Sequence, residues 1–225
     1  MDREQHQQLS SQPCFAVDID NVLAGAEREV QRLYVDLTGT PWPRGIYGSA
    51  GGLDNDGLTR EVVEKIFVRF HEYSIPRLPV LPSARMGLAQ LQHRYRIVII
   101  TARRPTSRAQ TLEWLRGHHL PFDELYHTAE KADVPENITL AVDDHPLHAL
   151  AYCERGVRVF LMDQPWNQAV VHPLLARVYG WDDLLHQLDY GNRETWSSRL
   201  VESPRVKSLL QLATSQFAHP AVEAT

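Results

Sequence analysis

The pattern with the clearest chemical meaning is Asp18-Ile-Asp20, which ends the apolar stretch that begins at Cys14. Such a stretch is typical of a buried parallel strand, where side chains two residues apart point the same way. Both carboxylates should emerge at the carboxyl end of the strand, where open α/β sheets bind ligands. Adjacent carboxylates repel unless a cation or a shared proton relieves them, so the pair predicts a metal site with one acid free to attack or to move protons. The same pattern also occurs as simple turn chemistry at the end of a strand.

Two later segments could supply groups that bind phosphate. Thr101 follows the apolar run 96–100, and its hydroxyl with the next backbone N–H groups could hold phosphate oxygens. Arg103 or Arg104 could add a charged fork, although Thr101 could equally cap the helix that follows. Lys131 could balance the charge of a phosphate and a nucleophile, or it could be an ordinary solvated lysine.

A second acid pair, Asp143 and Asp144, ends the apolar run 138–142. Carboxyl ends of parallel strands meet at one edge of a sheet, so these acids should join Asp18 and Asp20. Four acids gathered there would be electrostatically untenable without a divalent cation. Oxygen ligands of this kind suit Mg²⁺, which keeps several waters.

The elements that must position these residues alternate along the chain. Strands are predicted over 15–19, 96–100, 124–127, 138–142 and 157–162, and helices over 106–118, 146–154 and 181–188. Strands that alternate with helices predict an α/β protein with a Rossmann-like parallel sheet and helices on both faces.

The long segment between the first two strands predicts an insert. It contains helical patterns over 26–37, 59–72 and 83–93, with a Pro/Gly-rich break between the first two. So much sequence exceeds what a crossover needs, so we expect a small helical cap over the carboxyl edge of the sheet. The cap should choose the leaving group through aromatic side chains that could stack on a base or pack in the cap's own core: Trp42, Tyr47, Phe70 and Tyr73. Phe70 lies on the apolar stripe of its helix, which favours the core.

These patterns divide the chain into a core over 1–23 and 96–190, a cap and its return over 24–95, and an extension over 191–225. The extension carries a helical patch near 206–212, and we expect it to be partly disordered or docked on a partner. A homodimer is one possible assembly.

Composition limits the class of protein. With 225 residues and a net charge of −5, the chain is large enough for a sizeable core and has no basic face for a long nucleic-acid footprint. Cys14 and Cys153 form no metal-type pair, which favours a reducing compartment. The Gln-rich start lacks a signal peptide's apolar segment, and no apolar run reaches the ~20 residues of a membrane helix. We therefore expect a soluble cytoplasmic protein without membrane contact.

Taken together, Asp18-x-Asp-x-Val, Ile99-Ile-Thr-Ala-Arg, a lysine and Val142-Asp-Asp resemble the four ordered motifs of the haloacid dehalogenase (HAD) superfamily. The resemblance covers residues 14–165, and the insert resembles that superfamily's small cap. Within it, the chain is most similar to the 5′(3′)-deoxyribonucleotidase-like group. The supporting segments are Thr101-Ala-Arg-Arg-Pro, Thr111-Leu-Glu-Trp-Leu, Pro121-Phe-Asp-Glu-Leu and Val159-Phe-Leu-Met-Asp-Gln-Pro-Trp-Asn. Phosphatase domains of polynucleotide kinases share these features.

The resemblance implies a role for each motif residue. Asp18 would be the nucleophile that forms an aspartyl-phosphate, and Asp20 the acid/base that protonates the leaving oxygen and then activates water. The catalytic set is completed by Thr101 and Lys131, and the phosphate would be bound by Thr101, Ala102, Arg103 and Lys131. Mg²⁺ would be held by Asp18, the backbone carbonyl of Asp20, and Asp143, with Asp144 as an alternative ligand or a supporting partner.

One residue departs from the motif. Many members have Gly after the second Asp, where this chain has Asn21, a residue that tolerates positive φ better than most. His145, beside the second acid pair, could support the metal ligands or be a surface histidine of the turn.

The implied function is that of a Mg²⁺-dependent phosphomonoesterase acting on a small phosphorylated substrate, such as a (deoxy)nucleoside monophosphate. Two alternatives remain open from the sequence: a phosphatase for nucleic-acid 3′ ends, and a HAD-like binding module without catalysis. The intact set of Asp18, Asp20, Thr101, Lys131 and Asp143 argues against the binding module.

Overall fold

The computed structural model describes residues 12–42 and 59–190 of the chain. Of these, the residues up to Leu184 belong to one compact unit and those from Leu185 to a second one. Several predictions concern residues that lie outside the described ranges. These residues are the N-terminal segment, most of the Pro/Gly-rich break with Tyr47, and the 191–225 extension with its helical patch near 206–212. The predicted boundaries between core, cap and extension therefore stay a prediction.

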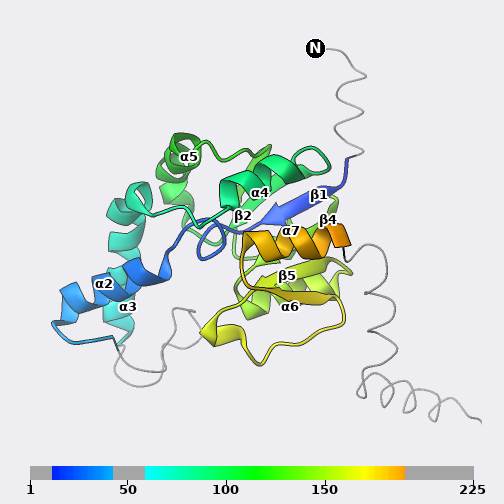
Figure 1. The fold of residues 1–225 in the computed structure, drawn as a ribbon. Helices are drawn as coiled ribbons and strands as arrows, with labels where there is room; N and C mark the ends of the chain where they lie inside the picture. The colour runs from blue at the N-terminus through cyan, green and yellow to red at the C-terminus, as the bar shows by residue number, and fades with distance from the viewer. Residues whose placement is uncertain (1–11, 43–58, 191–225) are drawn as a thin grey trace, which may run out of the picture. The chain divides into compact units, whose positions relative to one another are not determined.

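The centre of the fold is a parallel six-stranded sheet in the order β3-β2-β1-β4-β5-β6 (Figure 1). Its strands are β1 (Cys14–Val17), β2 (Arg96–Thr101), β3 (Glu124–His127), β4 (Ile138–Asp143), β5 (Arg158–Met162) and β6 (Leu175–Val178). The strand order reverses at β1, which pairs with both β2 and β4. A crevice at the carboxyl ends of the strands is expected at such a reversal. The predicted α/β fold class is confirmed.

The strand β6 was not predicted from the sequence. It is short, and only Val178 among its four residues is fully buried. An edge strand of only four residues is defined by its pairing with β5, which periodicity cannot detect.

Helices and short turns connect the strands. Among the described residues before residue 155 there are five α-helices of eight to twelve residues: α2 (Glu27–Thr38), α3 (Arg60–Arg69), α4 (Ala84–Leu91), α5 (Arg108–Gly117) and α6 (Pro146–Glu154). The helix α7 (Trp181–Tyr190) follows β6, and the single-turn elements are η1 (Phe70–Ser74), η2 (Ile75–Arg77), η3 (Pro105–Ser107), η4 (Lys131–Asp133) and η5 (Pro165–Asn167). The helix predicted over 59–72 is α3 followed by η1, a π-helical turn.

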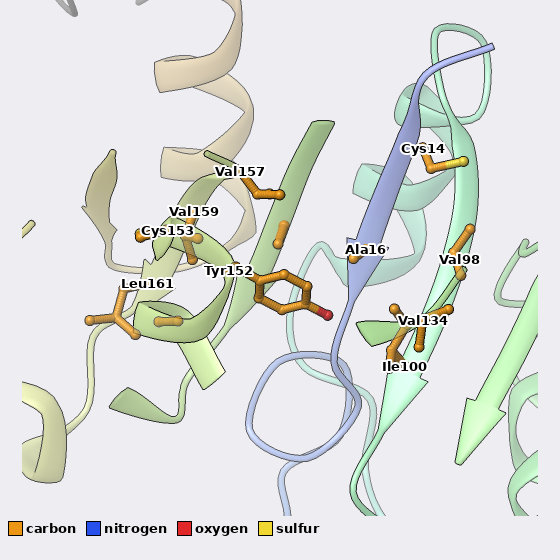
Figure 2. Packing of buried hydrophobic residues seen from close by; sticks show 12 residues of the cluster. Cys14, Ala16, Val98, Ile100, Val134, Tyr152, Cys153, Val157, Val159 and Leu161 are labelled. Atoms are coloured by element: carbon orange, nitrogen blue, oxygen red, sulfur yellow. The ribbon is translucent and has the colours of Figure 1, made fainter. Parts of the chain in front are cut away.

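The two faces of the sheet bury alternate strand residues. On one face, Ala16, Val98, Ile100 and neighbouring strand residues pack against α6, from which the Tyr152 ring extends toward β1 (Figure 2). On the other face, the ring of Phe15 stacks on Phe160 at 6.2 Å between centroids. Burial on both faces explains why the middle residues of β1, β2, β4 and β5 are apolar on either side of the sheet.

The insert leaves and rejoins the sheet through two paired linkers. Ala24 forms an antiparallel bridge with Val80, and the Leu81 N–H donates to the Leu23 carbonyl at 2.8 Å. Between the linkers, α2 and α3 lie side by side (Figure 1). The two linkers of the insert are therefore hydrogen-bonded to each other at Leu23 and Ala24, just after Asp20 in the chain.

Trp181 anchors the turn that follows β1. Its indole N–H donates to the Val22 carbonyl at 2.7 Å, and its ring packs on the bare backbone of Gly87 in α4. This contact decides the residue type at position 87, because a Cβ there would lie 2.3 Å from the ring.

Gly87→Ala is expected to lower the free energy of unfolding by about 1–3 kcal/mol, the usual cost of overpacking. Gly117→Ala is the matched control, since a Cβ there meets nothing within 4 Å. Alanine favours a helix over glycine, so this control should be neutral or stabilising. Urea unfolding followed by circular dichroism measures both. Equal stability of the two variants would contradict the packing argument.

Within the described residues, no helix has the length and apolar character needed to cross a bilayer.

Candidate active site

A buried lysine joins two of the predicted acids at the carboxyl edge of the sheet. The Lys131 Nζ lies 2.8 Å from the Asp18 carboxylate and 2.8 Å from that of Asp143. Asp18 follows β1, Asp143 ends β4, and Lys131 begins η4 after β3, so three segments meet there. The lysine side chain is only 2% exposed, so Lys131 is not a solvated surface residue.

The charges of this cluster do not balance. Burial raises the pKa of Asp18 to about 6. The ammonium of Lys131 lowers this pKa, whereas the negative charges of Asp143 and Asp20 raise it further. Burial also raises the pKa of Asp144 well above its usual range, helped by Asp18 and Asp143. Burial would raise the pKa of Asp143 as well, but Lys131 and His148 lower it below the ordinary value. One ammonium thus serves three buried carboxylates, which leaves excess negative charge.

That excess charge fits a cation. One oxygen from each of Asp18, Asp143 and Asp144 can be chosen so that all three lie within 4.8 Å of one another. All three residues are buried, and a purely carboxylate donor set suits a hard divalent ion such as Mg²⁺. Asp20 does not join this group with its side chain.

Asp20 instead pairs with Arg103 across the sheet edge. The Arg103 Nη2 and Nε donate to the two carboxylate oxygens at 2.6 and 2.9 Å. The guanidinium predicted as a phosphate fork is therefore occupied by a protein carboxylate. Arg104 turns away to an exposed ion pair with Glu64 at 2.6 Å.

Thr101 is the last residue of β2, and Ala102 begins the loop that follows. Thr101 is buried, and its hydroxyl oxygen accepts the Arg103 backbone N–H at 3.2 Å, which leaves the hydroxyl hydrogen available to a ligand. Ala102 is exposed. This arrangement offers a hydroxyl beside a small exposed residue.

Asn21 adopts the left-handed conformation that the motif's glycine would supply, with φ of 60°. Its side chain also forms two bonds that glycine cannot. Its Nδ2 donates to the Asp144 carboxylate at 3.2 Å, and its Oδ1 accepts the Glu27 N–H at the start of α2 at 2.9 Å. Asn21 thus links a candidate metal ligand to the first helix of the insert.

Two further residues hold the site; their segment, 159–167, supported the family resemblance, but no role was predicted for either residue. The buried Asn167 donates to the carbonyls of Asp144 and Met162 at 2.8 and 2.7 Å, and the Trp166 indole donates to the Asp144 carbonyl at 3.2 Å. Both lie in η5, where Gln164 and Asn167 form a capping box. A Gln-Pro-x-Asn run directly after a strand is the signal that could have identified them.

The remaining candidates have the following surroundings. His145 is partly buried, and its backbone N–H donates to the Asp143 carboxylate at 2.8 Å. Phe70 is 4% exposed, as its place on the apolar stripe predicts. Trp42 packs edge-on against Tyr34 at 5.2 Å between ring centroids, and Tyr73 is exposed.

Comparison with known proteins identifies the family of the chain. Residues 12–188 match the family described as 5′ nucleotidase, deoxy (pyrimidine), cytosolic type C protein. A protein of Clostridium acetobutylicum named as a nucleotidase is 26% identical over 106 residues, 45% of this chain. The chain spans about half the length of the curated relatives it matches, 55% and 53%.

Solved structures show the same fold at low identity. The haloacid dehalogenase-like hydrolase SP0104 of Streptococcus pneumoniae has a TM-score of 0.60 at 19% identity, over 79% of this chain and 99% of its own. CbbY of Rhodobacter sphaeroides, solved with phosphate, has a TM-score of 0.54 at 15% identity, over 78% and 98%. The predicted resemblance is confirmed: the chain belongs to the deoxy (pyrimidine), cytosolic type C 5′-nucleotidase family and has a haloacid dehalogenase-like fold.

Proposed function

We propose that this protein is a Mg²⁺-dependent phosphomonoesterase that hydrolyses a nucleotide, such as a (deoxy)nucleoside monophosphate, through an aspartyl-phosphate on Asp18. The observation that carries the proposal is the buried Lys131, 2.8 Å from both Asp18 and Asp143. A lysine held so deeply among acids has little use in a binding module, but it can balance a nucleophile and an incoming phosphate.

The metal ligands in this proposal are the carboxylates of Asp18 and Asp143 and the backbone carbonyl of Asp20. Asp144, held by Asn21, would be a further ligand or a supporting acid. When bound, Mg²⁺ would supply positive charge beside the phosphoryl oxygens and relieve the excess charge of the buried acids. The three carboxylates whose oxygens can lie within 4.8 Å of one another support this assignment.

The chemical steps follow from the positions of the acids. A carboxylate oxygen of Asp18 forms a bond to phosphorus while the bond to the substrate oxygen breaks, and Asp20 donates a proton to that leaving oxygen. Asp20 then takes a proton from water as the water oxygen attacks phosphorus, and the bond to Asp18 breaks to release phosphate. Thr101, the Ala102 backbone N–H and Lys131 would hold the phosphoryl oxygens throughout.

The test is phosphate release from a substrate panel, measured after EDTA treatment and again after Mg²⁺ is restored. We expect deoxynucleoside monophosphates to be hydrolysed faster than sugar phosphates, and only with the metal present. Preference for 3′-phosphorylated oligonucleotides would redirect the proposal to nucleic-acid ends. Absence of metal-dependent release from every member of the panel would refute it in favour of a binding module.

We also propose a cytoplasmic location for this activity. Support comes from Cys14 and Cys153, the chain's two cysteines, which are both buried and unpaired. Reduced thiols are the usual state in the cytosol.

A further inference from the structure

The contact between Asp20 and Arg103 is the most specific feature of the site that the proposed mechanism does not use. Both carboxylate oxygens of Asp20 accept from the guanidinium, at 2.6 and 2.9 Å. A bidentate pair of this kind fixes the plane of the carboxylate as well as its position. The arginine side chain is 1% exposed and that of Asp20 is 27% exposed, so the guanidinium is buried while the carboxylate is partly accessible to solvent.

The guanidinium is itself held on several sides. Its carbon lies 5.9 Å from the ring centroid of Phe70 in η1 and 5.9 Å from that of Trp114 in α5. Its Nη1 reaches the Thr111 hydroxyl, also in α5, at 3.4 Å. The Trp114 indole is fixed in turn by donation to the Leu78 carbonyl at 2.8 Å. A buried arginine in contact with two aromatic rings has little freedom to turn toward a ligand.

The π-helical turn η1 also holds the loop that carries Arg103, through His71. The Arg104 backbone N–H donates to the His71 Nε2 at 3.3 Å, and the His71 Nδ1 lies 2.7 Å from the Phe67 carbonyl. Single π-helical turns are frequent at functional sites because they reorient neighbouring side chains. Here Phe70 contacts Arg103 and His71 accepts from the Arg104 N–H, so the turn holds two consecutive residues of one loop.

This geometry opposes the expectation that Arg103 is a phosphate fork. The edge formed by Nε and Nη2, which would bind a phosphate side-on, already binds Asp20. A substrate could reach that edge only by displacing a carboxylate. The guanidinium therefore suits support of Asp20 better than contact with the substrate.

We propose that Arg103 is the positioning residue of the acid/base Asp20, and that Phe70 and Trp114 hold its guanidinium in place for this task. The inference rests on the proposed function, because it assigns the residue that orients the carboxylate of Asp20. It predicts that Arg103 affects turnover and not substrate affinity, and that it has no effect once Asp20 has lost its carboxylate.

The first test compares steady-state kinetics of Arg103→Met, Arg103→Lys and the wild type on a deoxynucleoside monophosphate. For Arg103→Met we expect kcat to fall by roughly 10- to 100-fold, the penalty of a misplaced catalytic group, with KM changed less than about twofold. Arg103→Lys should recover part of kcat, because lysine keeps the charge without the fork. Arg32→Met, which breaks an exposed ion pair with Glu29 in α2, is the control and should retain wild-type kinetics.

The second test is a double-mutant cycle with Asp20→Asn, measured as single-turnover release of the nucleoside from a deoxynucleoside monophosphate, whose alkoxide leaving group needs an acid. Arg103→Met should slow this release in the wild type more than in the Asp20→Asn background, where it should have no further effect. A structural role would give equal losses in both backgrounds and would overturn the inference. A raised KM with unchanged kcat would overturn it in favour of direct phosphate binding.

Folding of each variant is checked by circular dichroism and thermal unfolding. If Arg103→Met does not fold, Phe70→Leu replaces it in the cycle. Phe70→Leu removes one of the two aromatic contacts of the guanidinium and leaves the ion pair between Arg103 and Asp20. It should lower kcat less than Arg103→Lys does, and again only when Asp20 is present. Wild-type protein without metal-dependent phosphate release would refute the proposed function together with this inference, whereas an active wild type with unchanged variants would refute the inference alone.

Discussion

Asp18→Asn should abolish phosphate release from a nucleoside monophosphate while leaving the fold intact. An amide cannot form the acyl-phosphate, so we expect turnover to fall by roughly 10⁴- to 10⁶-fold, as when a covalent nucleophile is removed. Asparagine has the size of aspartate, and its oxygen can still accept from the Lys131 ammonium that lies 2.8 Å from Asp18. Release of phosphate is measured with Mg²⁺ in excess.

The same substitution should make the metal-free protein more stable. Burial, together with Asp143 and Asp20, raises the pKa of Asp18 to about 6, so its charge at neutral pH opposes folding. Removing that charge should raise the free energy of unfolding in EDTA by about 1–3 kcal/mol, since one pKa unit corresponds to ~1.4 kcal/mol. The gain should shrink in Mg²⁺, because the cation relieves the same repulsion in the wild type.

Loss of activity together with a gain of stability separates a reacting group from a structural one. A structural aspartate would lower both quantities when replaced. Retained turnover in Asp18→Asn would refute the nucleophile assignment, and a lower stability in EDTA would refute the charge argument.

Lys131→Met should cause the largest loss of stability of any substitution in the site. It removes the side chain that pairs with both Asp18 and Asp143, and no other ion pair of the described residues joins these two acids. Breaking a buried pair in this way costs about 3–5 kcal/mol, because the remaining charges stay buried without compensation. Turnover should fall as well, since the phosphate would lose its ammonium partner. Urea unfolding in EDTA measures the stability.

Lys65→Met is the matched control for this substitution. Lys65 pairs with Glu61 on α3 at 2.6 Å, but both side chains are more than half exposed, and such pairs contribute about 1 kcal/mol or less. Mg²⁺ should restore part of the stability of Lys131→Met and almost none of that of Lys65→Met. Equal stability of the two variants would contradict the view that Lys131 neutralises the buried acids.

Much of the fold could be predicted because its strands are buried on both faces. Five apolar runs matched β1 to β5, and turn residues marked their ends. The strand β6 escaped because an edge strand is defined by its partner. The end of α3 at Arg69 escaped because α-helical and π-helical turns have nearly the same apolar spacing over one turn.

By itself, the sequence determined which residue types could do the chemistry and which strand ends would carry them. Asp18, Thr101, Lys131 and Asp143 each follow or end a parallel strand, and parallel strands deliver their carboxyl ends to one edge. Position along the chain therefore predicted that Asp18, Lys131 and Asp143 would come together, as they do. Asn21 could be recognised beside them as a residue able to replace glycine at positive φ.

Only the tertiary structure decided which side chains contact one another at that edge. Arg103 could bind phosphate or a protein acid, and its pairing with Asp20, 83 residues away, depends on how Phe70 and Trp114 hold the guanidinium. The bond from Asn21 to Asp144 likewise joins residues 123 positions apart. Such choices depend on distances of a few tenths of an ångström between packed elements, whereas residue types and spacing specify only which partners are chemically possible.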